Sequence, residues 1–212
     1  MSIDIRNICK SFEGKTVLEN FSILLESNKV YCFLGPSGSG KTTIFNIIAG
    51  IMQADSGTID GLENKKIATV FQQPRLAPWL TAAENVELVC GGDSELSAYW
   101  LTKMALKEEL NTLPRDLSGG MRQRVSIARA LAYGGDILLL DEPFNGLDGA
   151  LKKQVWGNIR ERFAGKTILV ITHHQSEAEE IADEIILMDG PPLTVLQVVN
   201  NKDNNKDKRS EN

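Results

Sequence analysis

A glycine-rich stretch directly after an apolar run limits the folds open to this chain. The run, Val30–Leu34, is typical of a central parallel strand. It is followed at once by Gly35-Pro36-Ser37-Gly38-Ser39-Gly40-Lys41-Thr42, and then by a helical pattern from Thr42 to Ala49. The motif Gly-x4-Gly-Lys-Thr between a strand and a helix is the phosphate-binding P-loop. The chain is therefore expected to form an α/β sheet with a phosphate site at a strand end.

Each part of this loop has a chemical task. Glycines let backbone N–H groups converge on phosphate oxygens, and the helix N-terminus adds the positive end of its dipole. Lys41 is expected to reach the β- and γ-phosphates, the Thr42 hydroxyl to ligate Mg²⁺, and Thr43 to donate to the α-phosphate. A glycine-rich turn without a ligand is the alternative, and the flanking strand and helix argue against it.

A second apolar run, Ile137–Leu140, ends in two acids, Asp141 and Glu142. Side chains at the carboxyl ends of parallel strands lie at the ligand-binding edge of an α/β sheet. Asp141 is predicted to hold Mg²⁺, directly or through water, and Glu142 to orient and polarise an attacking water. The alternative is that both carboxylates only cap the next turn.

Between these motifs, Leu117-Ser118-Gly119-Gly120 opens a helix rich in Arg and Ala. A hydroxyl, bare backbone N–H groups and a helix N-terminus together favour an anion. Because the P-loop already binds a phosphate, a second anion site needs a phosphate of its own. Taken alone, the segment also fits a plain N-capped helix.

The three motifs in this order resemble the ATP-binding cassette (ABC) ATPases, over about residues 3–198. The resemblance implies a P-loop NTPase core with a mainly parallel sheet, a small antiparallel β subdomain and an inserted helical subdomain at about residues 74–132. Within that insertion the pattern predicts helices at 82–89 and 95–110. The ABC ATPase domain is expected to cover residues 1–199, and the polar residues 200–212 to form a disordered tail.

The resemblance also implies a closed dimer with a second ATPase subunit, either a copy of this chain or a related subunit. In that dimer Ser118, Gly119 and Gly120 would meet the γ-phosphate held by the P-loop of the other subunit. Asp148 resembles the acid of the D-loop, which lies along the dimer interface, although Asn145-Gly146 departs from the usual Ser-Ala.

Further positions match the family's nucleotide contacts. Gln72 resembles the Q-loop glutamine, which touches Mg²⁺ and the water, and is preferred to the adjacent Gln73 because it directly follows phenylalanine. His173 resembles the switch histidine that contacts the γ-phosphate, and the Thr-His order favours it over His174. Phe12 fits the aromatic residue that stacks on adenine, with a core phenylalanine as the alternative.

The segment from Gln72 to Val86 resembles the nitrate, sulfonate and taurine importer ATPases, in which Pro-Arg-Leu-Leu-Pro-Trp-Leu-Thr is typical. Ala77 replaces one leucine. The segment would form part of the groove that receives the permease. Trp79 is then either an anchor for that partner or part of the core.

Composition limits the partners. A net charge of -5 provides no general basic surface, so no nucleic acid is expected. No apolar run reaches the ~20 residues that span a bilayer, so a membrane role would come through a partner. We expect a peripheral ATPase subunit of an ABC importer on the cytoplasmic face of the cell membrane. It would bind ATP and Mg²⁺, a transmembrane permease and, through the permease, an extracytoplasmic solute-binding protein. A soluble ABC ATPase outside transport is the alternative.

Overall fold

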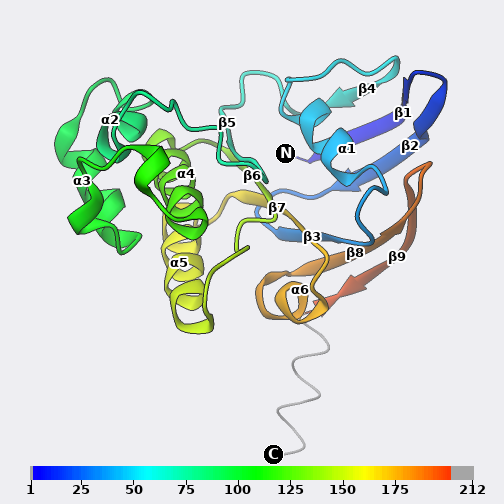
Figure 1. The fold of residues 1–212 in the computed structure, drawn as a ribbon. Coiled ribbons are helices and arrows are strands. Elements are labelled where there is room, and N and C mark those ends of the chain that lie inside the picture. The colour runs from blue at the N-terminus through cyan, green and yellow to red at the C-terminus, as the bar shows by residue number, and fades with distance from the viewer. Residues whose placement is uncertain (1, 202–212) are drawn as a thin grey trace, which may run out of the picture. The chain divides into compact units, whose positions relative to one another are not determined.

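The computed structural model describes residues 2–201, which form two compact units (Figure 1). Among the described residues, unit 1 is built from 2–65 and 165–201, and unit 2 from Lys66–Ala164. Of the predicted tail, Asn200 and Asn201 are described, and residues 202–212 lie outside the described residues.

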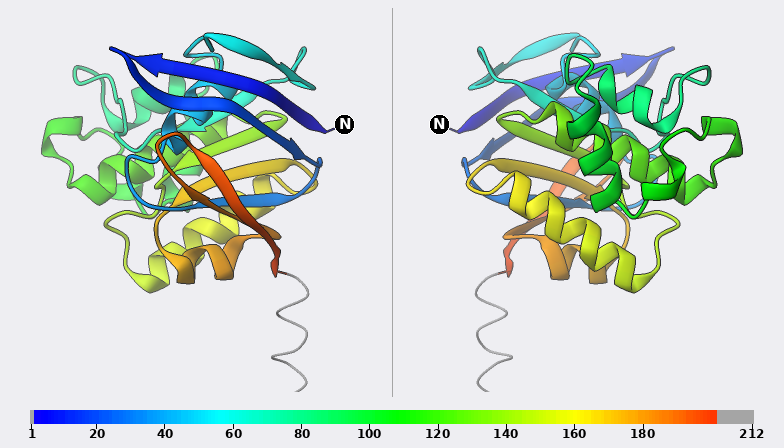
Figure 2. Two further views of the ribbon diagram at one scale, coloured as in Figure 1. Left: turned by 90° about the vertical axis from the view of Figure 1, so that its right-hand side faces the viewer. Right: turned by 90° about the vertical axis from the view of Figure 1, so that its left-hand side faces the viewer.

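Unit 1 contains a three-stranded antiparallel sheet in the order β2-β1-β4. Its strands are β1 (Ile3–Phe12), β2 (Lys15–Leu25) and β4 (Ser56–Asp60), and Figure 2 shows the long β1 and β2 side by side. Glu13 and Gly14 both have positive φ angles, of 48° and 81°, as the tight turn of a two-residue hairpin requires. This hairpin places Phe12 at the tip of the sheet.

The second sheet of unit 1 has the strand order β7-β3-β8-β9. Its strands are β3 (Val30–Leu34), β7 (Thr167–Thr172), β8 (Glu184–Asp189) and β9 (Thr194–Asn200), with the helices α1 (Lys41–Ile48) and α6 (Gln175–Ile181). β3 is parallel to β7 and β8, and every residue of β7 is buried, as expected for a sheet covered on both faces. β9 pairs antiparallel with β8 and was not predicted, although three valines and a leucine among its seven residues favour a strand.

Unit 2 combines two parallel strands with a group of helices. It contains β5 (Ile67–Val70), β6 (Ile137–Asp141), α2 (Ala82–Glu87), α3 (Ser94–Lys103), α4 (Gly119–Tyr133) and α5 (Gly149–Arg162), and 3-10 turns at Lys107–Glu109 and Pro114–Asp116. Figure 1 shows α2, α3 and α4 gathered together.

The helix predicted for residues 95–110 is shorter in the structure, because α3 ends at Lys103. Ala105 has a φ of 55°, a left-handed conformation that stops a helix. The Arg124 Nη1 atom donates to the carbonyls of Met104, at 2.7 Å, and Ala105, at 2.9 Å. A contact from α4 therefore supports the end of α3, and local sequence could not reveal it.

α2 begins with a reciprocal cap. The Thr81 hydroxyl accepts from the Glu84 N–H at 3.2 Å, and the Glu84 carboxylate accepts from the Thr81 N–H at 2.7 Å. The Thr81 N–H, and then the Thr81 hydroxyl, lower the pKa of the Glu84 carboxyl below its usual value. The cap fixes the point at which the preceding loop enters the helix.

A buried amide side chain holds that loop. The Asn85 Oδ1 atom accepts from the Ala77 N–H at 2.7 Å, and its Nδ2 atom lies within 3.1 Å of the carbonyl oxygens of Ala77, Leu80 and Thr81. Asn85 has no exposed surface, so water cannot replace these bonds. One side chain thus fixes the path of residues 77–81.

We expect Asn85→Ala to lower the free energy of unfolding by about 2–3 kcal/mol, because it strands buried backbone groups. In a chain of this length that corresponds to a loss of roughly 4–12 °C in Tm. Asn85→Asp should be at least as harmful, since its carboxylate would face three carbonyl oxygens. Thermal melts of both variants, with the exposed Gln73→Ala as control, would measure this; wild-type stability in Asn85→Ala would contradict it.

Candidate active site

The P-loop joins β3 to α1 in unit 1, and its glycines are required by the backbone. A Cβ atom at Gly35 would lie 2.3 Å from the carbonyl oxygen of Met188, so only glycine fits there. Gly38 and Gly40 have φ angles of 81° and 111°, a region that side chains rarely adopt. The loop shape predicted from the motif is therefore present.

The end of α1 next to this loop suits an anion. Its N-cap residue, Gly40, has no side chain to cap the helix, and the first turn contains no acidic residue. The Lys41 ammonium donates to the carbonyl oxygens of Gly35, at 2.9 Å, and Pro36, at 2.6 Å, and lies 3.1 Å from the Ser39 Oγ atom. A positive charge is thus held against a loop whose residues Pro36–Gly38 are exposed.

Strand register places His173 at the same sheet edge as the P-loop. β3 and β7 are parallel with Leu34 opposite Thr172, so Gly35 and His173 both follow directly at the carboxyl ends. His173 is exposed, and its ring centroid lies 3.9 Å from that of His174. The structure therefore brings these two predicted elements together, and the preference for His173 over His174 stays a prediction.

A corresponding edge in unit 2 carries the predicted water-orienting and metal-binding residues. β5 and β6 are parallel with Val70 opposite Leu140, so Gln72 and the Asp141–Glu142 pair leave at the same edge. Both carboxylate residues are buried, at 5% and 8% exposure. Glu142 has a φ of 48°, which is strained for a residue with a side chain. Such strain is characteristic of functional positions.

The predicted metal ligands all carry oxygen. Thr42 offers a hydroxyl, Asp141 a carboxylate and Gln72 an amide oxygen, the donor type that Mg²⁺ takes together with phosphate oxygens. Within residues 2–201, no cluster of three or more His, Cys, Asp or Glu side chains could hold a metal by itself. The donor set therefore fits a metal that arrives with a phosphate ligand.

Ser118 begins α4 in unit 2. Its hydroxyl accepts from the Met121 N–H at 3.2 Å, and the first turn contains no acidic residue. A Cβ atom at Gly119 would meet nothing within 4 Å, whereas at Gly120 it would lie 2.9 Å from the carbonyl oxygen of Gly146. The segment is thus an N-capped helix without acidic residues in its first turn, a setting that suits an anion, and the anion site stays a prediction.

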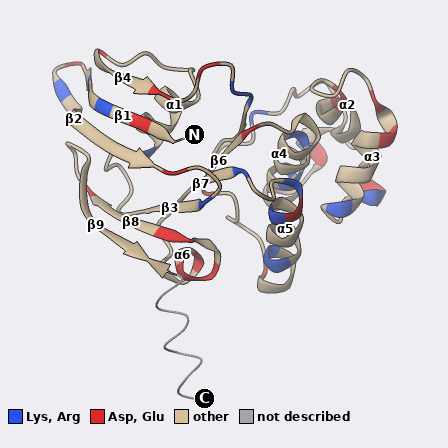
Figure 3. Cartoon of the chain, turned by 180° about the vertical axis from the view of Figure 1, so that it is seen from behind, with Lys and Arg blue, Asp and Glu red and all other residues tan. Residues whose placement is uncertain are grey.

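The arginines of α4 donate hydrogen bonds to backbone carbonyls. Arg122 Nη1 donates to the Leu117 carbonyl at 2.6 Å, and Arg129 donates to the carbonyls of Pro74, at 3.0 Å, and Arg75, at 3.1 Å. Burial lowers the pKa of Arg129 from its usual value. Figure 3 shows basic residues on α4, whereas the helix α6 of unit 1 carries acidic residues. Arg129 therefore supports the segment that follows Gln72, a role that sequence analysis missed because its partners are carbonyls far along the chain.

Two aromatic residues, for which the sequence left a core position as the alternative to a binding role, are exposed. Phe12 is 41% exposed and Trp79 is 76% exposed, so neither is a core residue and both core alternatives are wrong. Asp148, the predicted D-loop acid, caps α5 by accepting from the Leu151 N–H at 2.9 Å. It thus has a structural task as well as its predicted place at a dimer interface.

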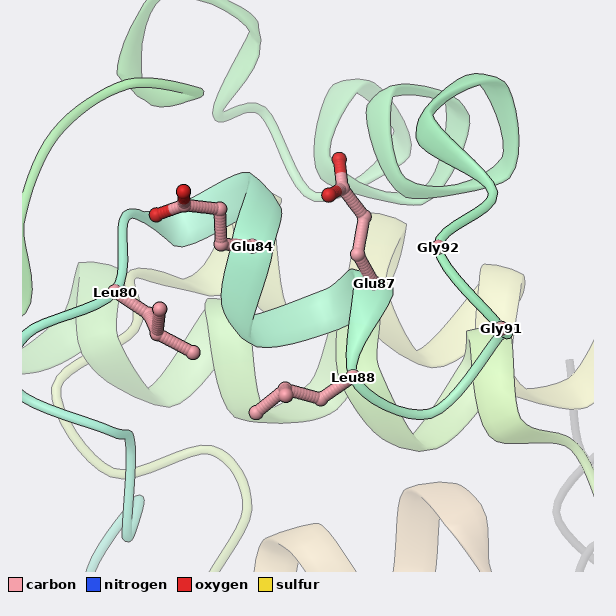
Figure 4. A pocket seen from close by; sticks show the side chains of 6 residues that line it. All are labelled: Leu80, Glu84, Glu87, Leu88, Gly91 and Gly92. Carbon is pink, nitrogen blue, oxygen red and sulfur yellow. The ribbon is translucent and has the colours of Figure 1, made fainter.

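A shallow pocket of about 410 Å³ lies along α2 and the loop after it. Figure 4 shows its lining, with two acidic and two leucine side chains: Leu80, Glu84, Glu87, Leu88, Gly91 and Gly92. Leu88 is 62% exposed. The pocket therefore offers an apolar surface bordered by negative charge, beside the loop that carries Trp79 in the sequence.

Comparison with known proteins identifies the family. The model of the ABC transporter family matches residues 18–145. The aliphatic sulfonates import ATP-binding protein SsuB 1 of Pseudomonas savastanoi pv. phaseolicola is 38% identical over 200 residues, covering 92% of this chain and 84% of that protein. This chain belongs to the ABC transporter family. It is therefore an ABC ATPase that binds and hydrolyses ATP.

Other relatives agree with this assignment. A probable sulfate/thiosulfate import ATP-binding protein CysA of Chlorella vulgaris is 39% identical over 207 residues, covering 89% of this chain and 88% of the relative. A dimeric post-hydrolysis structure of the ATP-binding cassette MJ0796, bound to ADP and Pi, superposes with a TM-score of 0.84 at 29% identity, covering 93% of this chain and 98% of that chain. The predicted fold class and the predicted ATPase activity of this cassette are confirmed.

The close approach at Gly120 yields a stability test within this ABC cassette. We expect Gly120→Ala to be about 1–3 kcal/mol less stable than Gly119→Ala, because the added methyl presses on the Gly146 carbonyl. Both changes replace glycine by alanine at the start of α4, so helix propensity largely cancels. Urea unfolding of the two variants measures the difference, and equal midpoints would show that the loop at Gly146 yields freely.

Proposed function

We propose that this chain is the ATP-hydrolysing subunit of an ABC importer, which couples ATP binding and hydrolysis to solute uptake through a partner permease. The observation that carries the proposal is its similarity, over most of its length, to SsuB 1 and CysA, both named as import ATP-binding proteins. The same relatives argue against a soluble ABC ATPase outside transport. Because they are named for different solutes, we assign solute choice to the permease and its binding protein.

The chemistry we propose is in-line attack of water on the γ-phosphate of ATP. The P-loop amides, Lys41 and Thr43 hold the phosphates, and Phe12 stacks on adenine. Glu142 orients the water and accepts its proton as the new oxygen–phosphorus bond forms and the bond to ADP breaks. His173 contacts the γ-phosphate. Mg²⁺, when bound, would supply positive charge that offsets the charge of the phosphates.

We assign Thr42, Asp141 and Gln72 as the residues that hold this Mg²⁺. Their oxygen donors support the assignment, as does the parallel register that sends Gln72 and Asp141 to one edge of β5 and β6.

A second subunit completes each site in this proposal. Ser118 and the two glycines after it would contact the γ-phosphate bound by the other subunit, with Asp148 at the interface. Support comes from the exposed Ser118 at a helix end without acidic residues in its first turn and from the dimeric MJ0796 cassette. The sequence is compatible with a homodimer or with a related second subunit.

We place the subunit peripherally on the cytoplasmic face of the cell membrane. Among residues 2–201, none of the helices is long and apolar enough to cross a bilayer. Trp79 is the proposed anchor for the permease, with the pocket beside α2 as a neighbouring contact surface. The solute-binding protein would act through the permease from the other side of the membrane.

Replacing the proposed water-orienting carboxylate tests the chemistry. Glu142→Gln should bind ATP normally and lose about a hundredfold or more of kcat, because an amide accepts a proton poorly. It should also accumulate an ATP-bound dimer, visible by size-exclusion chromatography. Glu179→Gln, the same change at an exposed site on α6, is the matched control. Near-normal turnover in Glu142→Gln would remove Glu142 from this role.

The permease anchor is tested at Trp79. Trp79→Ala should reduce recovery with a co-expressed permease about tenfold or more, while Tm changes by no more than about 1 °C, since the side chain is exposed. Leu196→Ala, which removes a 65% exposed leucine from β9, should leave permease binding intact. Full permease binding by Trp79→Ala would exclude the anchor.

A further inference from the structure

A carboxylate just before β4 holds the end of β1. The Asp55 Oδ1 atom accepts from the Lys10 ammonium at 2.6 Å, and its Oδ2 atom accepts from the Ser11 N–H at 2.7 Å. The Asp55 N–H in turn donates to the Cys9 carbonyl at 2.9 Å. Three consecutive residues of β1 are thus tied to one aspartate.

These hydrogen bonds from Asp55 lie where the backbone pairing between β1 and β4 stops. The β1–β4 ladder runs from Asp4 opposite Asp60 to Cys9 opposite Ser56. The β1–β2 pairing has register shifts around Lys10, where the strand is irregular. Asp55 therefore supplies hydrogen bonds to the part of β1 that β4 no longer pairs with.

Phe12 is the next residue along this strand. The Lys10 ammonium, held by Asp55, lies 5.6 Å from the centroid of the Phe12 ring, within the range of a cation–π contact. The ring is 41% exposed at the hairpin tip, so it depends on its backbone and on this neighbour for its orientation. Asp55 contacts both supports, since it accepts from the Ser11 N–H of that backbone and from the Lys10 ammonium.

Its two partners favour the charged form of the Asp55 carboxylate. Lys10 and the Ser11 N–H lower the pKa of Asp55 below its usual value. The contact is partly exposed, with 46% of the Asp55 side chain accessible against 17% of Lys10, so its effect is on geometry more than on overall stability.

We propose that Asp55 is a positioning residue for nucleotide binding, which presents the Phe12 ring to adenine through Lys10 and Ser11. The inference rests on the proposed role of Phe12. An exposed ring that is already in its bound orientation loses less freedom when a base stacks on it, so pre-organisation should appear as affinity for ATP. The phosphate contacts at the P-loop do not involve this strand end and should not change.

The test compares ATP with inorganic tripolyphosphate, which has the phosphates but no base. Asp55→Ala in the full chain should raise KM and Kd for Mg²⁺·ATP about fivefold to tenfold, with kcat within about twofold and tripolyphosphate affinity unchanged. Asp55→Asn should have a smaller effect, because its amide oxygen can still accept from the Ser11 N–H. Lys10→Met should reproduce this smaller effect, because it removes the ion pair with Asp55 and keeps the Ser11 contact.

The matched control is Asp60→Ala, at the other end of β4. Asp60 also pairs with a cation of β1, since Arg6 lies 3.4 Å away, but it is remote in sequence from Phe12. It should leave ATP affinity unchanged. An equal loss in Asp60→Ala, or an equal loss of tripolyphosphate affinity in Asp55→Ala, would overturn the proposal by showing a general effect on the sheet.

Phe12→Ala separates this inference from the function on which it rests. Loss of stacking should weaken ATP about tenfold, and adding Asp55→Ala to it should cause no further loss. Normal ATP affinity in Phe12→Ala would remove the adenine contact itself. A weakened Phe12→Ala beside a normal Asp55→Ala would keep the adenine contact and overturn the role of Asp55.

Discussion

Parallel pairing of buried strands determines where the polar chemistry of this protein lies. Every residue of β6 and β7 is buried, and the first four residues of β3 are buried as well. The strands can expose polar groups only where they end, and parallel strands end at the same edge. Gly35 and His173 share such an edge in unit 1, as Gln72 and Asp141 do in unit 2. The hydrophobic core thus positions the site without contributing a reacting group.

The exposed residues that we assign to partners lie on backbone segments that polar side chains fix by hydrogen bonds. Asn85 fixes the loop that carries Trp79, and Arg129 binds the carbonyls that follow Gln72. Asp55 has the same relation to Phe12. An exposed side chain has few packing contacts of its own, so its orientation depends on the backbone that bears it. Hydrogen bonds to that backbone therefore support function without touching a ligand.

Local sequence predicted most elements because their signals are local. The P-loop glycines, the buried strand runs and the acids at the end of β6 each lie within a few residues, and the structure has them where the pattern indicated. The length of α3 was wrong, since its end depends on Arg124, which lies on another helix. β9 was missed even though its own residues, with three valines and a leucine, favour a strand that pairs with β8.

The sequence alone determined the family, the ATPase chemistry and the residues with predicted roles, because phosphate binding requires particular residues at fixed spacing. Tertiary structure decided questions of environment. It showed that Phe12 and Trp79 are exposed, although aromatic residues lie more often in a core than on a surface. It also identified the supports at Asn85, Arg129 and Asp55, whose partners are backbone groups. Every residue has such groups, so only the folded chain specifies which of them a side chain meets.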